Sequence, residues 1–187
     1  MDNPFSEVPV LPVVIPLGVV VFAILVWRLF ATRSFSLPRA VVAAALAIYA
    51  AGIVANTVFP IYLDKPDRAE PWTPYVALIP FADYELADAL MNVAVFVPLG
   101  MLIPLVLTRP TWWKVISITV AASATIEIAQ LAVQGLFRGG HIADVSDLIC
   151  NTAGGVLGYG ILIAVTAIPW AARLINRFRW ASSTQAD

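Results

Sequence analysis

The chain has 187 residues, of which 60% are hydrophobic and 12% are charged, and its formal net charge is −1. A mean hydropathy of +0.86, with about half the charged fraction usual in soluble proteins, is not typical of a water-soluble domain. The nearly neutral charge argues against nucleic acid as a partner. The single cysteine, Cys150, excludes an intramolecular disulfide.

Five long apolar segments predict transmembrane helices. Four windows contain no charged residue, at 8–27, 40–63, 89–108 and 148–172, and Glu127 alone interrupts a fifth at 115–137. Each reaches the roughly 20 residues that a hydrocarbon core requires. The sequence therefore predicts an all-α polytopic bundle of about five helices in a single membrane domain. We expect these helices at 10–31, 40–62, 89–108, 113–136 and 147–170, followed by a basic tail at 171–187.

The first segment is interpreted as a retained helix, not as a cleaved signal peptide. No positive region precedes it, and Arg28 and Arg33 follow it. Prolines at positions 4, 9, 12 and 16 leave open whether the helix begins near residue 10 or only near Ile15.

Basic residues predict the orientation of the bundle. Eight of the eleven Lys and Arg residues follow the first, third and fifth segments: Arg28, Arg33, Arg39, Arg109, Lys114, Arg173, Arg177 and Arg179. The positive-inside rule makes this side cytoplasmic, with the N-terminus outside and the C-terminus inside. Tyr84 then lies on the outer side, where we expect it to rest on the membrane surface like Trp72 and Tyr75.

Polar residues in the outer half of the predicted bundle form the candidate site. A carboxyl such as Glu127 costs roughly 2.5 to 3.5 kcal/mol within a membrane helix on insertion scales, so it should face protein. Gln130 lies on the same helical face. Asn92 and Asn151 lie at a similar depth in the membrane, each about one turn from the outer end of a neighbouring helix. Three helices thus contribute polar groups to one layer.

A second polar run opens the last long segment. His141, Asp144, Asp147 and Asn151 are spaced three, three and four residues apart, which places them on one helical face, and Asp144 or Asp147 could be the N-cap. A purely structural interpretation makes these groups caps and interhelical hydrogen bonds, with Glu127 neutral and bonded to Gln130 or Asn151. Their concentration in the outer layer instead favours a functional pocket.

Other chemistries have less support. A lone histidine without a metal-binding spacing gives no expectation of a metal or another cofactor. Ser123 lies on a membrane helix without a histidine in sequence reach, so we expect no serine nucleophile. The chain also lacks the inverted repeats typical of transporters.

Small residues and prolines predict helix packing. Gly154 and Gly158 form a GxxxG motif that Gly155 widens, and this face could serve the bundle or a homodimer. Pro98 and Gly100 are expected to bend the third helix where it packs.

The polar motifs resemble those of the VanZ-like family of membrane proteins over about residues 59–160. LIPF at 78–81 resembles the segment before the family core, and MNVAVFVPLG at 91–100 is similar to the family's N-x-x-x-F-x-P-x-G helix. SATIEIAQ at 123–130 resembles S-x-x-x-E-x-x-Q. ADVSDLICNTAGGVLGY at 143–159 is similar to D-x-x-D-x-x-x-N-x-x-G-G-x-x-G.

One position departs from the family pattern. The family usually has arginine three residues before the first of these aspartates, whereas this chain has His141, with Arg138 one helical turn earlier. Either Arg138 reaches the same acids, or the histidine makes the site sensitive to pH. The change also removes a permanent bidentate donor.

The resemblance implies a cell-membrane protein of the envelope, linked to resistance to teicoplanin-type glycopeptides. We expect an outward-facing pocket that binds a lipid headgroup, a cell-wall precursor or the drug, formed by Asn92, Glu127, Gln130, Arg138, His141, Asp144, Asp147 and Asn151. The alternative is a membrane enzyme acting on a lipid-linked substrate. Glu127 would then be the acid or base, and Asp144, Asp147 and His141 are further catalytic candidates.

Overall fold

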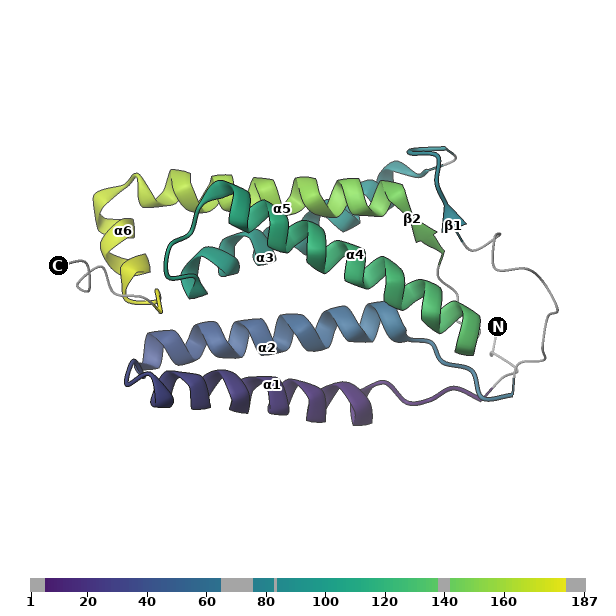
Figure 1. The fold of residues 1–187 in the computed structure, drawn as a ribbon, viewed down its shortest axis with the longest axis horizontal. Coiled ribbons are helices and arrows are strands. Elements are labelled where there is room, and N and C mark those ends of the chain that lie inside the picture. The colour runs from purple at the N-terminus through teal and green to yellow at the C-terminus, as the bar shows by residue number, and fades with distance from the viewer. Residues whose placement is uncertain (1–5, 65–75, 83, 138–141, 181–187) are drawn as a thin grey trace.

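Six helices make up most of the described part of the chain, and Figure 1 shows their arrangement. A computed structural model describes residues 6–64, 76–82, 84–137 and 142–180. Its helices are α1 (Leu11–Ala31), α2 (Leu37–Val58), α3 (Leu86–Val106), α4 (Trp112–Phe137), α5 (Val145–Thr166) and α6 (Pro169–Asn176). The first five are long and apolar enough to cross a membrane. This confirms the predicted all-α polytopic membrane bundle.

Helix α1 begins at Leu11, earlier than the start near Ile15 that its prolines left open. Pro12 lies in the first turn, where a backbone N–H has no intrahelical partner, so the missing donor costs little. Pro16 lies inside the helix without ending it. Helix α3 likewise continues through Pro98 and Pro104.

The helices form two groups that lie side by side (Figure 1). Helices α1 and α2 pack as an antiparallel pair, whereas α3, α4 and α5 form the other group, in which α3 and α5 make the most extensive contact. Phe96, Leu99, Ile103 and Val115 form the buried core of the second group. The residues of the resemblance therefore lie mainly in one compact part of the bundle.

Glycines let α3 and α5 approach closely. A Cβ atom on Gly154 or Gly158 would overlap backbone carbonyls of α3, and one on Gly100 would overlap the carbonyl of Gly155. Gly155 also contacts the Thr119 side chain of α4. The GxxxG face is therefore covered within the bundle, so it is not available for a second copy of the chain.

A short parallel strand pair joins two distant segments at one end of the bundle. Strand β1 (Val76–Ala77) pairs with β2 (Ala143–Asp144), which runs directly into α5. Near the same end, the Ser6 backbone N–H and hydroxyl donate to Asp64 at 2.8 and 2.9 Å. These bonds lower the pKa of the Asp64 carboxyl.

The basic connections lie at the opposite end of the bundle (Figure 1). They are the α1–α2 connection, the α3–α4 connection and the stretch from α6 to residue 180. Helix α6 overlaps the last two residues of the expected fifth helix and otherwise lies in the stretch expected to be a basic tail. The sequence did not predict a separate helix there. The segment after α6 returns to the bundle, where the Trp180 backbone N–H donates to the Leu105 carbonyl at 2.8 Å.

Candidate functional site

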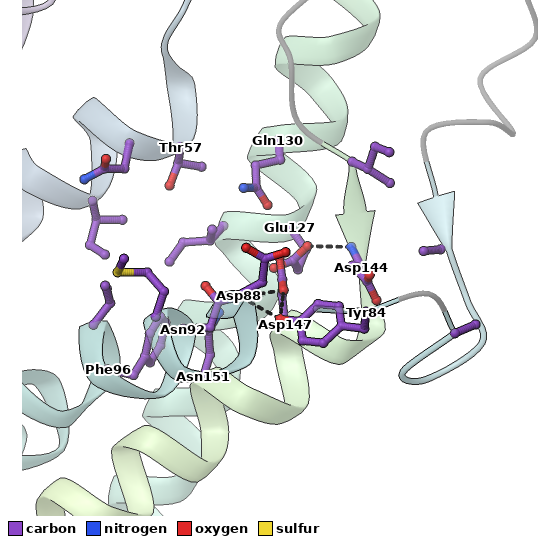
Figure 2. A pocket seen from close by; sticks show the side chains of 18 residues that line it. Thr57, Tyr84, Asp88, Asn92, Phe96, Glu127, Gln130, Asp144, Asp147 and Asn151 are labelled. Atoms are coloured by element: carbon purple, nitrogen blue, oxygen red, sulfur yellow. Dashed lines mark hydrogen bonds between the residues drawn. The ribbon is translucent and has the colours of Figure 1, made fainter. Parts of the chain in front are cut away.

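A cavity of about 710 Å³ opens at the β1–β2 end of the bundle. Four helices and the strand pair contribute to its wall, and Figure 2 shows the polar side chains gathered around it. The polar lining residues are Asn56, Thr57, Tyr84, Asp88, Asn92, Glu127, Gln130, Asp144, Asp147 and Asn151. Apolar residues such as Ile53 and Phe96 complete the wall.

Asp144 links the strand pair to the membrane helices. Its side chain accepts a 2.7 Å bond from the Ser146 backbone N–H, so it is the N-cap of α5. The Asp144 backbone N–H in turn donates to Glu127 Oε2 at 2.9 Å. Glu127 is therefore bonded to the start of α5, and not to Gln130 or Asn151 as the structural interpretation supposed. The strand pair fixes the position of this N–H, which residue spacing could not reveal.

Asp147 lies one turn further along α5 and is held by donors from the α3 side of the cavity. The Tyr84 hydroxyl donates a short hydrogen bond to its Oδ1, and Asn92 Nδ2 donates to the same oxygen at 2.5 Å. Asn92 Nδ2 also lies 2.8 Å from the Tyr84 hydroxyl. Burial, together with the adjacent Asp147 carboxylate, raises the pKa of Tyr84 above its usual range.

Two further hydrogen bonds hold the wall of the cavity in place, one deep in the bundle and one at the cavity entrance. Asn151 Nδ2 donates to the buried Ser123 hydroxyl at 3.0 Å, which joins α5 to α4 below the carboxyl groups. The buried Ser146 hydroxyl accepts from the Phe81 backbone N–H at 3.0 Å. Phe81 has a φ of 60°, a left-handed conformation that is unusual for a bulky side chain. The Ser146 bond thus holds a strained loop at the rim.

The cavity wall carries more acceptors than the protein satisfies. Within the described part of the chain, Glu127 Oε1, Gln130 Oε1 and Asn151 Oδ1 are buried and have no hydrogen-bond partner. Four carboxyl side chains also line the cavity, whereas none of its described lining residues is Lys or Arg. Buried acceptors without a donor are costly. The wall is therefore suited to a ligand that is cationic or rich in hydrogen-bond donors.

An exposed apolar loop borders this polar cavity. Ala77 and Ala82 line the cavity. Between them, Leu78, Ile79 and Phe81 are exposed by 71%, 72% and 53%. Phe81 also contacts Tyr84 edge to face, with 5.9 Å between the ring centroids. Apolar side chains that are this exposed, at the end of a membrane bundle, are suited to contact lipid.

Six of the eight ligand-binding residues predicted from the sequence line the cavity. Arg138 and His141, the other two, lie outside the described residues, so the structure does not place them. Tyr84 differs from its expected role on the membrane surface, because its hydroxyl points to Asp147. Asp88 lines the cavity as well, and its spacing of four from Asn92 was a usable signal. No comparable sequence signal indicated Tyr84.

The described residues contain no cluster of three or more His, Cys, Asp or Glu side chains arranged to hold a metal ion. The carboxyl groups of Glu127, Asp144 and Asp147 instead accept hydrogen bonds from backbone N–H groups, an amide and a phenol. This part of the chain consequently offers hydrogen-bonding groups and negative charge.

The fold and the cavity define a polytopic helical membrane protein with a polar pocket at one end of its helices. A family model described as VanZ/LLP1 matches residues 46–167, well over half of the chain. The protein therefore belongs to the VanZ/LLP1 family. Searches of curated proteins and of solved structures gave no match.

Proposed function

We propose that this protein is a cell-envelope member of its family whose polar pocket faces outward and binds an amphiphilic ligand, lowering susceptibility to teicoplanin-type glycopeptides. The observation that carries the proposal is the convergence of Asn92, Glu127, Asp147 and Asn151 on one cavity. They come from three different helices. Polar groups inside a membrane bundle are costly, and they commonly mark a functional site.

The chemistry of the cavity wall supports a ligand with an ammonium group. The carboxyl groups of Asp88, Glu127 and Asp147 attract positive charge, and the unpartnered oxygens of Gln130 and Asn151 can accept its N–H bonds. A bare phosphate headgroup would face like charge and few donors there. Lipid headgroups, cell-wall peptides and glycopeptide drugs can all present an amine, so this chemistry covers each ligand source considered above.

The apolar rim supports a ligand that also has a hydrophobic part. Leu78 and Ile79 lie beside the cavity entrance and are largely exposed. A ligand with its amine among the carboxyl groups could lay an acyl chain along this loop, gaining about 25 cal/mol for each Å² of apolar surface covered. This arrangement favours lipophilic glycopeptides over those that lack an acyl chain.

Susceptibility of a sensitive Gram-positive host tests the proposal. The host would express wild type, Glu127→Gln, Asp147→Asn or the control Thr125→Val, with equal membrane levels verified. Thr125 is a matched control because it lies on α4 outside the cavity and bonds to its own helix. We expect wild type and control to protect against teicoplanin more than against vancomycin, and both pocket variants to lose protection. If the host were equally susceptible to teicoplanin with and without the wild-type protein, the proposed role in resistance would be wrong.

A second candidate is an integral-membrane enzyme acting on a lipid-linked substrate. It is favoured by the position of Glu127, which borders the cavity and has one oxygen without a partner among the described residues. A carboxyl group placed in this way could exchange a proton with a substrate.

Binding separates the two candidates. Purified wild type and Glu127→Gln would be titrated with fluorescent teicoplanin and with an amine-bearing phospholipid. The enzyme hypothesis expects Glu127→Gln to bind normally and yet to lose protection, because the amide keeps the shape but cannot transfer the proton. The binding hypothesis expects affinity and protection to fall together.

A further inference from the structure

Helix α6 has three distinct faces. Ala171, on the packed face, is buried against the bundle, with 3% of its surface exposed. Trp170 and Leu174 are four residues apart and remain 65% and 49% exposed. Arg173 and Arg177 are also four residues apart and are exposed beside them. Residues four apart lie on the same side of a helix, so an apolar stripe runs next to a basic one.

The position of α6 in the fold places these apolar and basic stripes at the membrane surface. The helix follows α5, which is long enough to span the membrane, after only two residues. It turns across the end of the bundle and does not continue the line of α5 (Figure 1). An amphipathic helix placed there lies in the plane of the headgroups, where tryptophan is a favoured anchor.

The segment after α6 fixes this arrangement. Trp180 is buried against Leu29 of α1 and Ala43 of α2. The Arg28 guanidinium lies 5.7 Å from the Trp180 ring centroid, and Arg39 Nε donates to the Arg179 carbonyl at 2.8 Å. Both ends of α6 are therefore tied to membrane helices, so its exposed stripes have a fixed direction.

Among the residues that the structure describes, the charged side chains at this end are all basic. The basic residues in and beside the α1–α2 and α3–α4 connections gather there with those in and after α6, whereas the described acidic side chains belong to α4 and to the opposite end. A fixed positive surface at headgroup depth attracts anionic headgroups.

We infer that α6 is a binding surface for anionic phospholipids in the leaflet at the basic end of the bundle. Arg173 and Arg177 contact the phosphate headgroups, while Trp170 and Leu174 enter the boundary between headgroups and acyl chains. Each basic residue near such a surface contributes roughly fivefold in affinity, so the arginine pair gives about 25-fold. This surface is at the opposite end from the cavity and does not depend on the proposed function.

Tryptophan quenching tests the inference in the full-length protein. The protein in neutral detergent would be titrated with phosphatidylglycerol or phosphatidylcholine brominated near the carbonyl end of the acyl chains. The contribution of Trp170 is the difference in quenching between wild type and the Trp170→Phe variant. We expect phosphatidylglycerol to produce this contribution at a concentration at least tenfold lower than phosphatidylcholine does.

Two double variants that remove the same charge test whether the preference for phosphatidylglycerol depends on α6. The combined change Arg173→Gln and Arg177→Gln should abolish the preference for phosphatidylglycerol. The combined change Arg109→Gln and Lys114→Gln removes the same charge from the α3–α4 connection and the first turn of α4, and should leave the Trp170 signal close to that of wild type. Equal quenching by the two lipids in wild type, or an equal effect of the two double variants, would overturn the inference. Thermal melting of each protein verifies that it is folded.

Discussion

Tyr84 shows how one side chain connects the rim of the cavity to its acids. Its hydroxyl donates to Asp147 and accepts from Asn92, so a single phenol satisfies groups on α5 and α3. Sequence reasoning placed it on the surface because an aromatic residue near a predicted membrane boundary usually rests there. The segment between β1 and α3 instead turns Tyr84 toward the cavity, and this path is set by tertiary contacts that the sequence does not reveal.

Tyr84→Phe should lower stability by about 1 to 2 kcal/mol near neutral pH, since Asp147 loses a donor. The folded state raises the pKa of Tyr84, so this contribution is complete below the unfolded value of about 10 and declines as the pH rises above it. Melting temperatures at pH 7 to 11 should therefore show the difference from wild type shrinking above pH 10. A constant difference would contradict this assignment. Tyr159→Phe is the control.

Asp144 is the N-cap of α5, a role that the sequence alone could assign only to one of two aspartates. From the sequence, either Asp144 or Asp147 could be the cap of α5, and the side-chain bond to the Ser146 N–H identifies Asp144. Spacing indicated a helix start, but the choice depended on β2, whose two residues are too few to predict.

Asp144→Ala should cost about 1 kcal/mol through loss of the cap, whereas Asp144→Asn should be nearly neutral because asparagine caps equally well. Urea or thermal unfolding in detergent measures both. If the two variants were destabilised equally, the negative charge of Asp144 would matter more than the capping bond.

Among the elements, the α3–α5 pair was the most predictable and α6 the least. The glycine spacing in the fifth segment indicated a close helix contact, and the structure resolves the open choice of partner in favour of α3. Helix α6 has eight residues, which is too short to stand out next to a long apolar segment. Its stability comes from packing and from the anchor at Trp180, neither of which is visible in periodicity.

Gly158→Ala should destabilise the bundle by about 1 to 3 kcal/mol, because the added methyl group overlaps the Val97 carbonyl and the backbones must separate. Gly160→Ala is the matched control, since a Cβ there meets no atom within 4 Å. Thermal stability in detergent compares them. Similar melting temperatures for the two variants would mean that α3 and α5 are less closely packed than the structure has them.

At the scale of the whole molecule, apolar length alone predicted the membrane bundle. No soluble core requires five apolar segments of this length, so that conclusion did not depend on any contact. The cavity is different, because its size depends on how α2 lies against α3, α4 and α5. Residue patterns placed Glu127 and Asn151 in one layer, but could not show that Thr57 of α2 closes the opposite wall (Figure 2).

The proposed orientation predicts opposite labelling at the two ends of the bundle. Leu78→Cys lies on the exposed loop beside the cavity, and Thr32→Cys lies in the basic α1–α2 connection, each in a Cys150→Ser background. In intact cells, a membrane-impermeant maleimide should label the first cysteine, and it should label the second only after permeabilisation. This result would place the polar pocket where an external drug or a cell-wall precursor can reach it. The reverse pattern would turn the pocket toward the cytoplasm, and a direct encounter with an external glycopeptide could then not explain any resistance.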